Sequence, residues 1–172
     1  MTGTLEWIPA PDRPDLVAGP VAAALAGQTD VRVAAIDPDL ADTAAFCERY
    51  EVPLEISANC VVVAARRGGE TTYAACMVLA TQRADVNGVI RRQLGARKVS
   101  FAPMAEATSL TGMEYGGITP LGLPATWPIL VDTHVAAEPY VVIGSGVRSS
   151  KLLLPGKALG DLPGAEVLTL SQ

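Results

Sequence analysis

The chain has 172 residues, 49% of them hydrophobic and only 5% aromatic, which is enough for one buried core built from Ala, Val, Leu and Ile. Its net charge of −5 argues against broad, non-specific binding along a nucleic acid, but it is compatible with binding to one end of a nucleic acid. Three cysteines (Cys47, Cys60 and Cys76) without a C-x-x-C pattern, and an N-terminus without the basic start and apolar run of a signal peptide, favour a reduced, cytoplasmic protein whose cysteines are small core residues.

The first half of the chain alternates helical and strand patterns. Asp42 stands where it can cap a helix in which Phe46 and Tyr50 lie one turn apart on one face, and Pro53 stops that helix. In chain order the patterns predict a helix over 20–26 closed by Gly27, a strand over 31–36, a helix over 42–50, a strand over 59–65 and, after a hairpin turn at 66–69, a strand over 71–80.

The second half adds two helices and several short strands. The patterns predict a helix from Asp85 to Gly95, a strand over 98–101, a helix opened by Pro103 with the inner face Met104, Ala107 and Leu110, strands over 129–132, 140–143 and 166–170, and a further candidate strand over 151–154. Hairpins mixed with helices, without βαβ repetition, predict a single α/β domain over 1–172, with a mixed, largely antiparallel sheet flanked by helices.

An uncharged stretch from Tyr115 to Val131 contains three glycines and three prolines. So many breakers exclude a membrane helix and an ordinary core strand. A rigid loop remains, in which glycine lets a ligand approach the backbone, proline fixes φ and Thr119 supplies a hydroxyl. The loop is either a ligand-facing wall of backbone N–H groups or a structural turn. In the first case, Gly117→Val should abolish function and leave the fold nearly intact.

Other polar residues each have a structural and a functional interpretation. Asp132 ends a predicted strand and could cap the following turn. His134, the sole histidine, lacks a nucleophile motif such as G-x-S-x-G and is expected in a surface loop. No cluster of His, Cys and Asp has metal-ligand spacing, so no metal site is expected. No other cofactor is expected either. Arg91 and Arg92, in the densest positive patch of the chain, are either a solvated helix end or a contact for a nucleic-acid backbone.

The central motif runs Gly112-Met113-Glu114-Tyr115-Gly116-Gly117-Ile118-Thr119-Pro120-Leu121-Gly122 and is accompanied by Glu51-Val52-Pro53 before a strand, by Val131-Asp132, and by Ile143-Gly144-Ser145-Gly146-Val147-Arg148. With these segments in this order, residues 38–170 resemble the YbaK-like family of aminoacyl-tRNA deacylases, which includes the free-standing relatives of the prolyl-tRNA synthetase editing domain. The resemblance implies a YbaK-like, barrel-like fold and hydrolysis, in trans, of the ester that joins a wrong amino acid to the 3′ end of a tRNA.

The resemblance also implies where the substrate lies. The acceptor end of a mischarged tRNA is the implied partner, and Arg91 and Arg92 are the candidate contacts for its stem. An aminoacyl-tRNA synthetase is a further candidate partner, and no membrane is involved. Family members use no metal and no serine or cysteine triad, so backbone donors and an ordered water carry much of the chemistry. The implied substrate-binding residues are Gly116, Gly117, Ile118, Thr119, Pro120 and Gly122 of the central loop and Gly144, Ser145 and Gly146 of the later turn. Asn59 and Asp132 are the candidate catalytic residues.

The chain departs from the family at Asn59, where typical members have a lysine at the substrate end of the pocket. Asparagine still donates a hydrogen bond, but charge-assisted bonds are about twice as strong as neutral ones. Three interpretations stay open: another aminoacyl ester is the substrate, another cation substitutes, or hydrolysis has been lost. In the last case the chain is a non-catalytic binding module for an aminoacyl-adenosine end. A purely structural partner domain is a third hypothesis, against which the intact loop counts.

Overall fold

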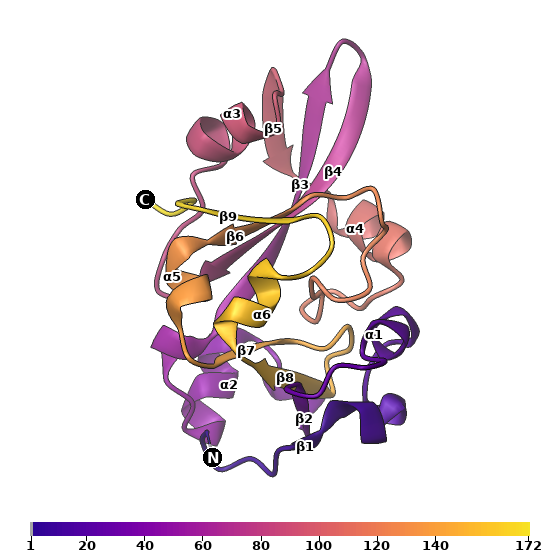
Figure 1. Cartoon of the computed structure of the whole chain (residues 1–172), viewed down its shortest axis with the longest axis vertical. Helices are drawn as coiled ribbons and strands as arrows, with labels where there is room; N and C mark the ends of the chain where they lie inside the picture. Colours follow the sequence, from indigo (N-terminus) through magenta and orange to yellow (C-terminus); the bar gives the residue numbers. More distant parts are fainter. Residues whose placement is uncertain (1) are drawn as a thin grey trace.

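Two β-sheets form the centre of the computed structural model, which describes residues 2–172 (Figure 1). The first sheet has the order β1-β2-β8-β7 and is antiparallel throughout. Its strands are β1 (Ile8–Pro9), β2 (Arg32–Ala35), β8 (Ser150–Leu154) and β7 (Val141–Gly144). The second sheet has the order β5-β3-β4-β6-β9, in which β6 pairs in parallel with both neighbours. Its strands are β5 (Lys98–Phe101), β3 (Ala58–Arg67), β4 (Glu70–Leu79), β6 (Ile129–Asp132) and β9 (Ala165–Leu168).

The predicted α/β fold with mainly antiparallel pairing is confirmed, but the strands divide between two sheets instead of one. The predicted hairpin is formed by β3 and β4, and Gly68 and Gly69 at its tip both have positive φ, which a tight two-residue hairpin turn requires. The candidate strand over 151–154 is β8. A parallel bridge between Ser57 and Val142 joins the two sheets.

Helices and single turns surround the sheets. They are η1 (Ala10–Asp12), η2 (Pro14–Leu16), α1 (Gly19–Ala24), η3 (Pro38–Leu40), α2 (Thr43–Tyr50), η4 (Leu54–Ile56), η5 (Val86–Ile90), α3 (Arg91–Gln93), α4 (Met104–Thr111), α5 (Thr133–Ala137) and α6 (Gly156–Gly160). Within residues 2–172 none of them combines the length and the apolar character needed to cross a bilayer.

The apolar side chains form layers. Between the sheets, Val33, Leu152 and Ile143 of the first pack with Met77 and Val131 of the second, together with side chains of α1, α5 and α6. On the outer face of the first sheet, Ala34, Val142 and Leu153 pack against Phe46 and Cys47 of α2. On the outer face of the second sheet, Val63, Ala65, Cys76 and Val99 pack against Ile90 of η5, which leads into α3. The order is therefore α2, first sheet, second sheet, α3.

The helix predicted from Pro103 begins as expected, but the predicted inner face is wrong. Met104 and Leu110 are 55% and 46% exposed, whereas Ala107 and Thr111 are buried. The helix is rotated because Ala107 packs with Val62 of β3. Met104 is left exposed and lines a cavity beside α2.

Of the two predicted helix caps, Asp85 makes capping hydrogen bonds and Asp42 does not. Asp85 accepts hydrogen bonds from the N–H groups of Gly88 and Val89, but the segment it opens is a π-helical turn followed by the three-residue α3, not one continuous α-helix. Asp42 holds the N-cap position of α2, yet its side chain makes no capping hydrogen bond. The positive end of α2 is therefore left open beside the cavity.

Candidate functional site

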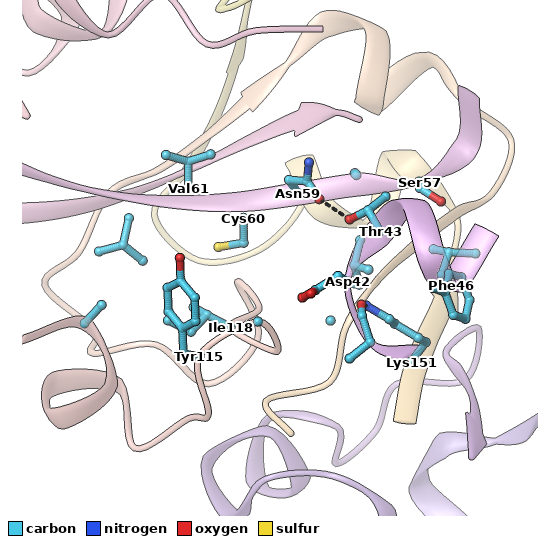
Figure 2. Close-up of a pocket in the computed structure, with 18 of the residues that line it drawn as sticks. Asp42, Thr43, Phe46, Ser57, Asn59, Cys60, Val61, Tyr115, Ile118 and Lys151 are labelled. Atoms are coloured by element: carbon cyan, nitrogen blue, oxygen red, sulfur yellow. Dashed lines mark hydrogen bonds between the residues drawn. The ribbon is translucent and has the colours of Figure 1, made fainter. Parts of the chain in front are cut away.

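A cavity of about 410 Å³ lies beside α2, where segments distant in sequence converge (Figure 2). This volume falls within the usual range of small-molecule sites. The lining consists of Ala41, Asp42, Thr43 and Phe46 at the start of α2; residues 57–62 around β3; Phe101, Ala102, Met104 and Ala107; Tyr115, Gly116 and Ile118; and Val142, Ile143, Gly144 and Lys151 from β7 and β8.

One wall of the cavity is an open edge of β3. Strand β5 pairs only with residues 63–66 of β3, and the N–H of Ala102 donates to the carbonyl of Val62 at 2.9 Å. In an antiparallel strand the N–H and C=O of one residue point to the same edge, and neighbouring residues alternate. Cys60, two residues before Val62, therefore directs its backbone groups at the edge that β5 leaves uncovered. A ligand in the cavity can pair with this edge.

The loop after α4 forms the opposite wall, and only part of it faces the cavity. Gly116 and Ile118 line the cavity, and their N–H groups have no hydrogen-bond partner among residues 2–172. Gly117 is buried behind them, where its carbonyl accepts a hydrogen bond from the N–H of Gly146 at 2.6 Å. Backbone donors are thus available at two of the predicted positions.

The expectation that Gly117→Val leaves the fold nearly intact is contradicted by this packing. A Cβ on Gly117 would lie 2.7 Å from the carbonyl oxygen of Val147, closer than real Cβ contacts come. The glycine at this position makes room for the backbone of the neighbouring turn and not for a ligand. A side chain there would displace the loop, so loss of activity in Gly117→Val would not report on backbone donors.

The turn Gly144-Ser145-Gly146 supports the loop more than it faces the cavity. Gly144 lines the cavity and is packed so closely that a Cβ on it would lie 2.6 Å from the carbonyl oxygen of Gly117. Ser145 is fully buried, and its hydroxyl donates to the carbonyl of Ser150 at 3.0 Å. Gly146 has a φ of 90°, which favours glycine.

The remaining predicted residues of the loop, Thr119, Pro120 and Gly122, are not among those that line the cavity. Thr119 is fully buried, and its hydroxyl has no hydrogen-bond partner within the described chain. Gly122 packs on α1, where a Cβ would lie 2.5 Å from the carbonyl oxygen of Pro20. The second half of the motif therefore anchors the loop to the N-terminal part of the chain.

Asn59, one of the two candidate catalytic residues, lines the cavity. It is exposed, and its side-chain oxygen accepts a hydrogen bond from the hydroxyl of Thr43 at 3.0 Å (Figure 2). This bond orients the carboxamide and ties β3 to the first residue of α2. The amide nitrogen is left with no partner among residues 2–172 and can donate to a ligand.

A lysine that sequence reasoning did not single out lies in the same cavity. Lys151 is only 8% exposed, and its Nζ donates to the carbonyl of Ala41 at 2.9 Å and lies 5.2 Å from the centre of the Phe46 ring. Burial lowers the pKa of Lys151 to about 8, and the Arg148 guanidinium acts in the same direction. No other lysine or arginine of the described chain lines the cavity. The one sequence feature that could have marked Lys151 as a site residue is its charge at the start of the otherwise apolar run 151–154.

The cavity mouth carries exposed apolar side chains. Phe101, Met104 and Tyr115 are 66%, 55% and 59% exposed, although each contributes to the lining. Beside them the guanidinium of Arg148 lies 3.4 Å from the carboxylate of Asp42. Large apolar side chains gathered around an opening are typical of a binding surface.

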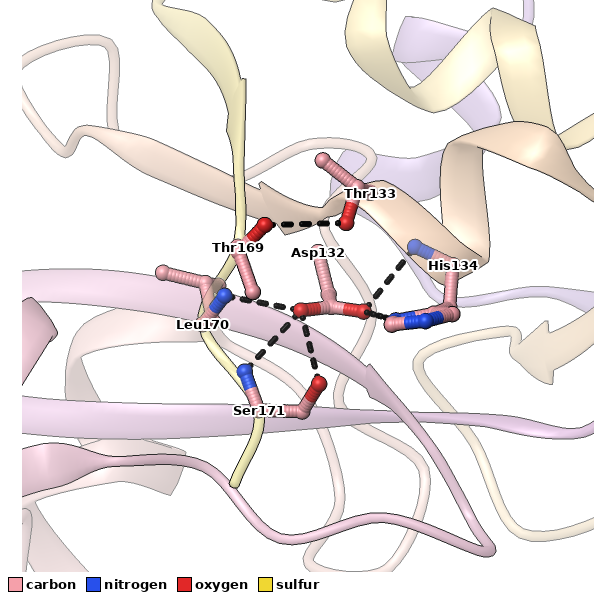
Figure 3. A network of polar contacts seen from close by, with 6 residues as sticks. All are labelled: Asp132, Thr133, His134, Thr169, Leu170 and Ser171. Carbon is pink, nitrogen blue, oxygen red and sulfur yellow. Dashed lines mark hydrogen bonds and ion pairs between the residues drawn. The ribbon is translucent and has the colours of Figure 1, made fainter.

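Asp132 lies outside the cavity lining, in a network of its own (Figure 3). Its buried carboxylate accepts hydrogen bonds from the N–H groups of Leu170, Ser171 and His134 at 2.7–3.0 Å and also contacts the imidazole of His134. Burial raises the pKa of Asp132, but these hydrogen bonds outweigh it and hold the pKa below its ordinary value. The geometry is that of a cap for α5 and an anchor for the C-terminal segment.

Arg91 and Arg92 are on α3, which covers the outer face of the second sheet and lies apart from α2 and α4 (Figure 1). The cavity is lined by residues of α2 and α4 and by none of α3. The structure therefore does not bring these two arginines together with the cavity residues.

The cysteines are free, and the one that lines the cavity is a poor nucleophile. Cys47 and Cys76 are buried, and Cys60 is partly exposed with its sulfur toward the cavity. Burial raises the pKa of the Cys60 thiol, which keeps it neutral and weakly nucleophilic. Among residues 2–172, no three His, Cys, Asp or Glu side chains are grouped to hold a metal ion.

Comparison with known proteins adds independent observations. Residues 37–162 match the family model described as "Aminoacyl-tRNA editing domain". No curated protein shows significant similarity to the chain.

Several solved structures have the same fold. A candidate trans-editing enzyme for prolyl-tRNA synthetase aligns with a TM-score of 0.75 and 20% identity over 97% of this chain and 99% of that one. A scaffold protein for the design of epitope presentation gives a TM-score of 0.77 and 22% identity over 90% and 97%. The hypothetical protein APE2540 gives 0.74 and 21% over 84% and 93%. Each identity is low enough that these likenesses bear on the fold alone.

Proposed function

The chain belongs to the aminoacyl-tRNA editing domain family, and we propose that it acts in trans as an aminoacyl-tRNA deacylase, hydrolysing the ester of a mischarged tRNA. The observation that carries this proposal is the cavity between the open edge of β3 and the loop at Gly116 and Ile118, because both walls present backbone groups that have no partner within residues 2–172. Fixed donors of this kind stabilise an ester oxygen as it gains charge.

The cavity mouth fits the other end of such a substrate. A tRNA ends in unpaired nucleotides, and bases stack on aromatic and apolar side chains whatever their sequence. Phe101, Met104 and Tyr115 offer such surfaces at the rim, while the deeper lining by Val62, Ala107 and Ile118 suits a small apolar part of a ligand. We assign the rim to the terminal adenosine and the interior to the aminoacyl group.

A non-catalytic binding module is the second candidate function. The observation that favours it is the neutral Asn59 at the cavity, in place of the lysine that the family resemblance implies. Asn59 and the loop donors would then recognise an aminoacyl-adenosine end without hydrolysing it. Asp132 has a structural role in either function, since its carboxylate is occupied away from the cavity.

The deciding experiment is a deacylation screen against a panel of tRNAs, each charged with a wrong amino acid. The proposed function predicts that at least one ester is hydrolysed well above its spontaneous rate. If every ester survives but a non-hydrolysable aminoacyl-adenosine binds, the chain is a binding module. The amino acid that is released, together with the tRNA that carries it, identifies the synthetase whose errors the protein corrects.

Arg91 and Arg92 provide a test of the tRNA footprint. We expect the double substitution Arg91→Glu and Arg92→Glu to raise KM for full-length tRNA about tenfold, because phosphate contacts dominate nucleic-acid affinity. The KM for aminoacyl-adenosine should not change, since α3 lies on the far side of the second sheet from the cavity. Binding of tRNA to the unmodified protein should have a shallow salt dependence, corresponding to about two to four phosphates.

The matched control reverses the charge of two exposed basic residues away from α3, through Arg83→Glu and Lys157→Glu. It therefore makes the same change in net charge. An equal rise in KM for both double variants would assign the effect to overall charge. No rise for the α3 variant would mean that the two arginines are a solvated helix end.

A further inference from the structure

Lys151 is placed where it can act on a ligand. It projects from β8 on the face that α2 covers, as its neighbour Leu153 does, and its Nζ reaches the carbonyl of Ala41 just before α2 (Figure 2). An ammonium group has three N–H donors. The bond to Ala41 uses one, and no other acceptor within residues 2–172 takes the remaining two. Two donors of a buried cation are therefore available to whatever enters the cavity.

Nothing in the described chain neutralises this cation at close range. No salt bridge includes Lys151, and the nearby Asp42 carboxylate is 77% exposed and contacts Arg148 instead. An unpaired buried charge is expensive to maintain. The start of α2 adds to the positive potential, because the side chain of Asp42 leaves its first N–H groups uncapped. This end of the cavity suits an oxygen atom that carries negative charge.

We propose that Lys151 Nζ binds the carbonyl oxygen of the aminoacyl ester and stabilises the negative charge that this oxygen acquires during hydrolysis. The inference rests on the proposed function and names a catalytic residue for it. The cation comes from β8 of the first sheet, across the cavity from Asn59 on β3 of the second sheet.

The chemistry balances without any cofactor. A water oxygen attacks the carbonyl carbon, and the carbonyl electron pair moves onto the oxygen held by Lys151 and the loop donors. When this pair returns, the bond from carbon to the ribose oxygen breaks. The ribose oxygen takes up the proton that the attacking water loses. The products are the free amino acid and a tRNA with an intact ribose hydroxyl, and Lys151 remains protonated throughout.

The proposed role requires Lys151 in its protonated, ammonium form. The burial of Lys151 and the charges around it set the pH range in which that form is present. Burial opposes the charged form most strongly, and Arg148, from the segment before β8, opposes it too, whereas Cys47 in the middle of α2 and Asp42 at its start favour it. With a pKa of about 8, Lys151 is mainly protonated at neutral pH and loses its charge as the pH rises through that value. After subtraction of the spontaneous rate, kcat/KM should fall above about pH 8. That fall should be absent in Lys151→Met.

The test that does not depend on turnover compares two adenosine derivatives as ligands. One carries alanine through a non-hydrolysable amide, and the other carries a negatively charged tetrahedral phosphonate in place of the carbonyl. For Lys151→Met we expect calorimetry to show about a hundredfold loss of affinity for the phosphonate, the scale of one oxyanion donor, and less than about threefold for the amide. Lys157→Met, on the exposed surface of α6, should change neither. Unchanged phosphonate affinity in a folded Lys151→Met protein would overturn the assignment.

Turnover separates the remaining outcomes. In the deacylation screen, Lys151→Met should lower kcat about a hundredfold on whichever ester the unmodified protein hydrolyses, with little change in KM. If the variant loses only esters of aspartate or glutamate and keeps the others, Lys151 reads an acidic side chain and the oxyanion role is wrong. If the unmodified protein hydrolyses no ester, the proposed function fails, and the phosphonate comparison still decides whether Lys151 binds a charged oxygen.

Discussion

Replacing Gly117 by alanine is expected to lower the free energy of unfolding by about 3 kcal/mol, the upper part of the usual range for overpacking a closed site. The added Cβ would lie 2.7 Å from the carbonyl oxygen and 3.0 Å from the amide nitrogen of Val147, and backbone atoms cannot move aside as a flexible side chain can. Urea denaturation of the variant and the unmodified protein at pH 7 measures the difference.

Gly19→Ala is the matched control. Gly19 also has an ordinary negative φ, and a Cβ there meets nothing within 4 Å, so the same methyl group should change stability by less than about 0.5 kcal/mol. If Gly117→Ala is as stable as the unmodified protein, the contact between the loop and the turn is looser than the structure has it. In that case the glycine would again be available to face a ligand.

Lys151→Met is expected to stabilise the fold at pH 7 by about 2 kcal/mol while impairing function. The shift of the Lys151 pKa from 10.5 to about 8 corresponds to about 3 kcal/mol of cost for keeping the ammonium buried. Methionine removes this cost and fills similar space. It also leaves the carbonyl of Ala41 without its donor, which destabilises the variant by about 1 kcal/mol and reduces the net gain. Thermal and chemical unfolding report the net gain.

The pH dependence distinguishes this explanation from better packing. Because the folded pKa lies below the unfolded one, the unfolded chain binds more protons between about pH 8 and 10.5, and the stability of the unmodified protein rises with pH across that window. The advantage of Lys151→Met should therefore shrink through the window and vanish near pH 10. A gain that stays constant with pH would show that the charge of Lys151 is not its source.

Local patterns were sufficient to predict most elements of the fold. The hairpin at Gly68 and Gly69, the strand 129–132 and the helix stop at Gly112 depend on a few adjacent residues, and each is found where the pattern placed it. The division into two sheets depends instead on long-range pairing, such as that of β2 with β8. The orientation of α4 likewise depends on contacts with β3, so spacing alone selected the wrong face.

The candidate site was predictable in part for the same reason. The glycine motif marked a loop that does reach the cavity, and the family resemblance, which aligns Asn59 with a lysine of the pocket, pointed to a residue that lines it. Which glycines face a ligand and which face Val147 or Pro20 depends on packing between distant segments. Lys151 was missed because nothing in the local sequence indicates that β8 passes beneath α2. Asp132 was a candidate catalytic residue at the polar end of a predicted strand, but its carboxylate accepts hydrogen bonds from the C-terminal residues Leu170 and Ser171.

The cavity can be reached from strands of both sheets, β3 on one side and β8 on the other. A charge inside it can therefore be supplied from either direction without any change in backbone topology. During divergence, a cation lost from one strand can be regained on the other through single substitutions, with the pocket intact at every step. When two sheets line one cavity, a functional residue can be missing from its usual position in an alignment while the protein is still active. Its absence there is therefore weak evidence that the protein is a pseudoenzyme. The chemical inventory of the whole cavity is the better criterion.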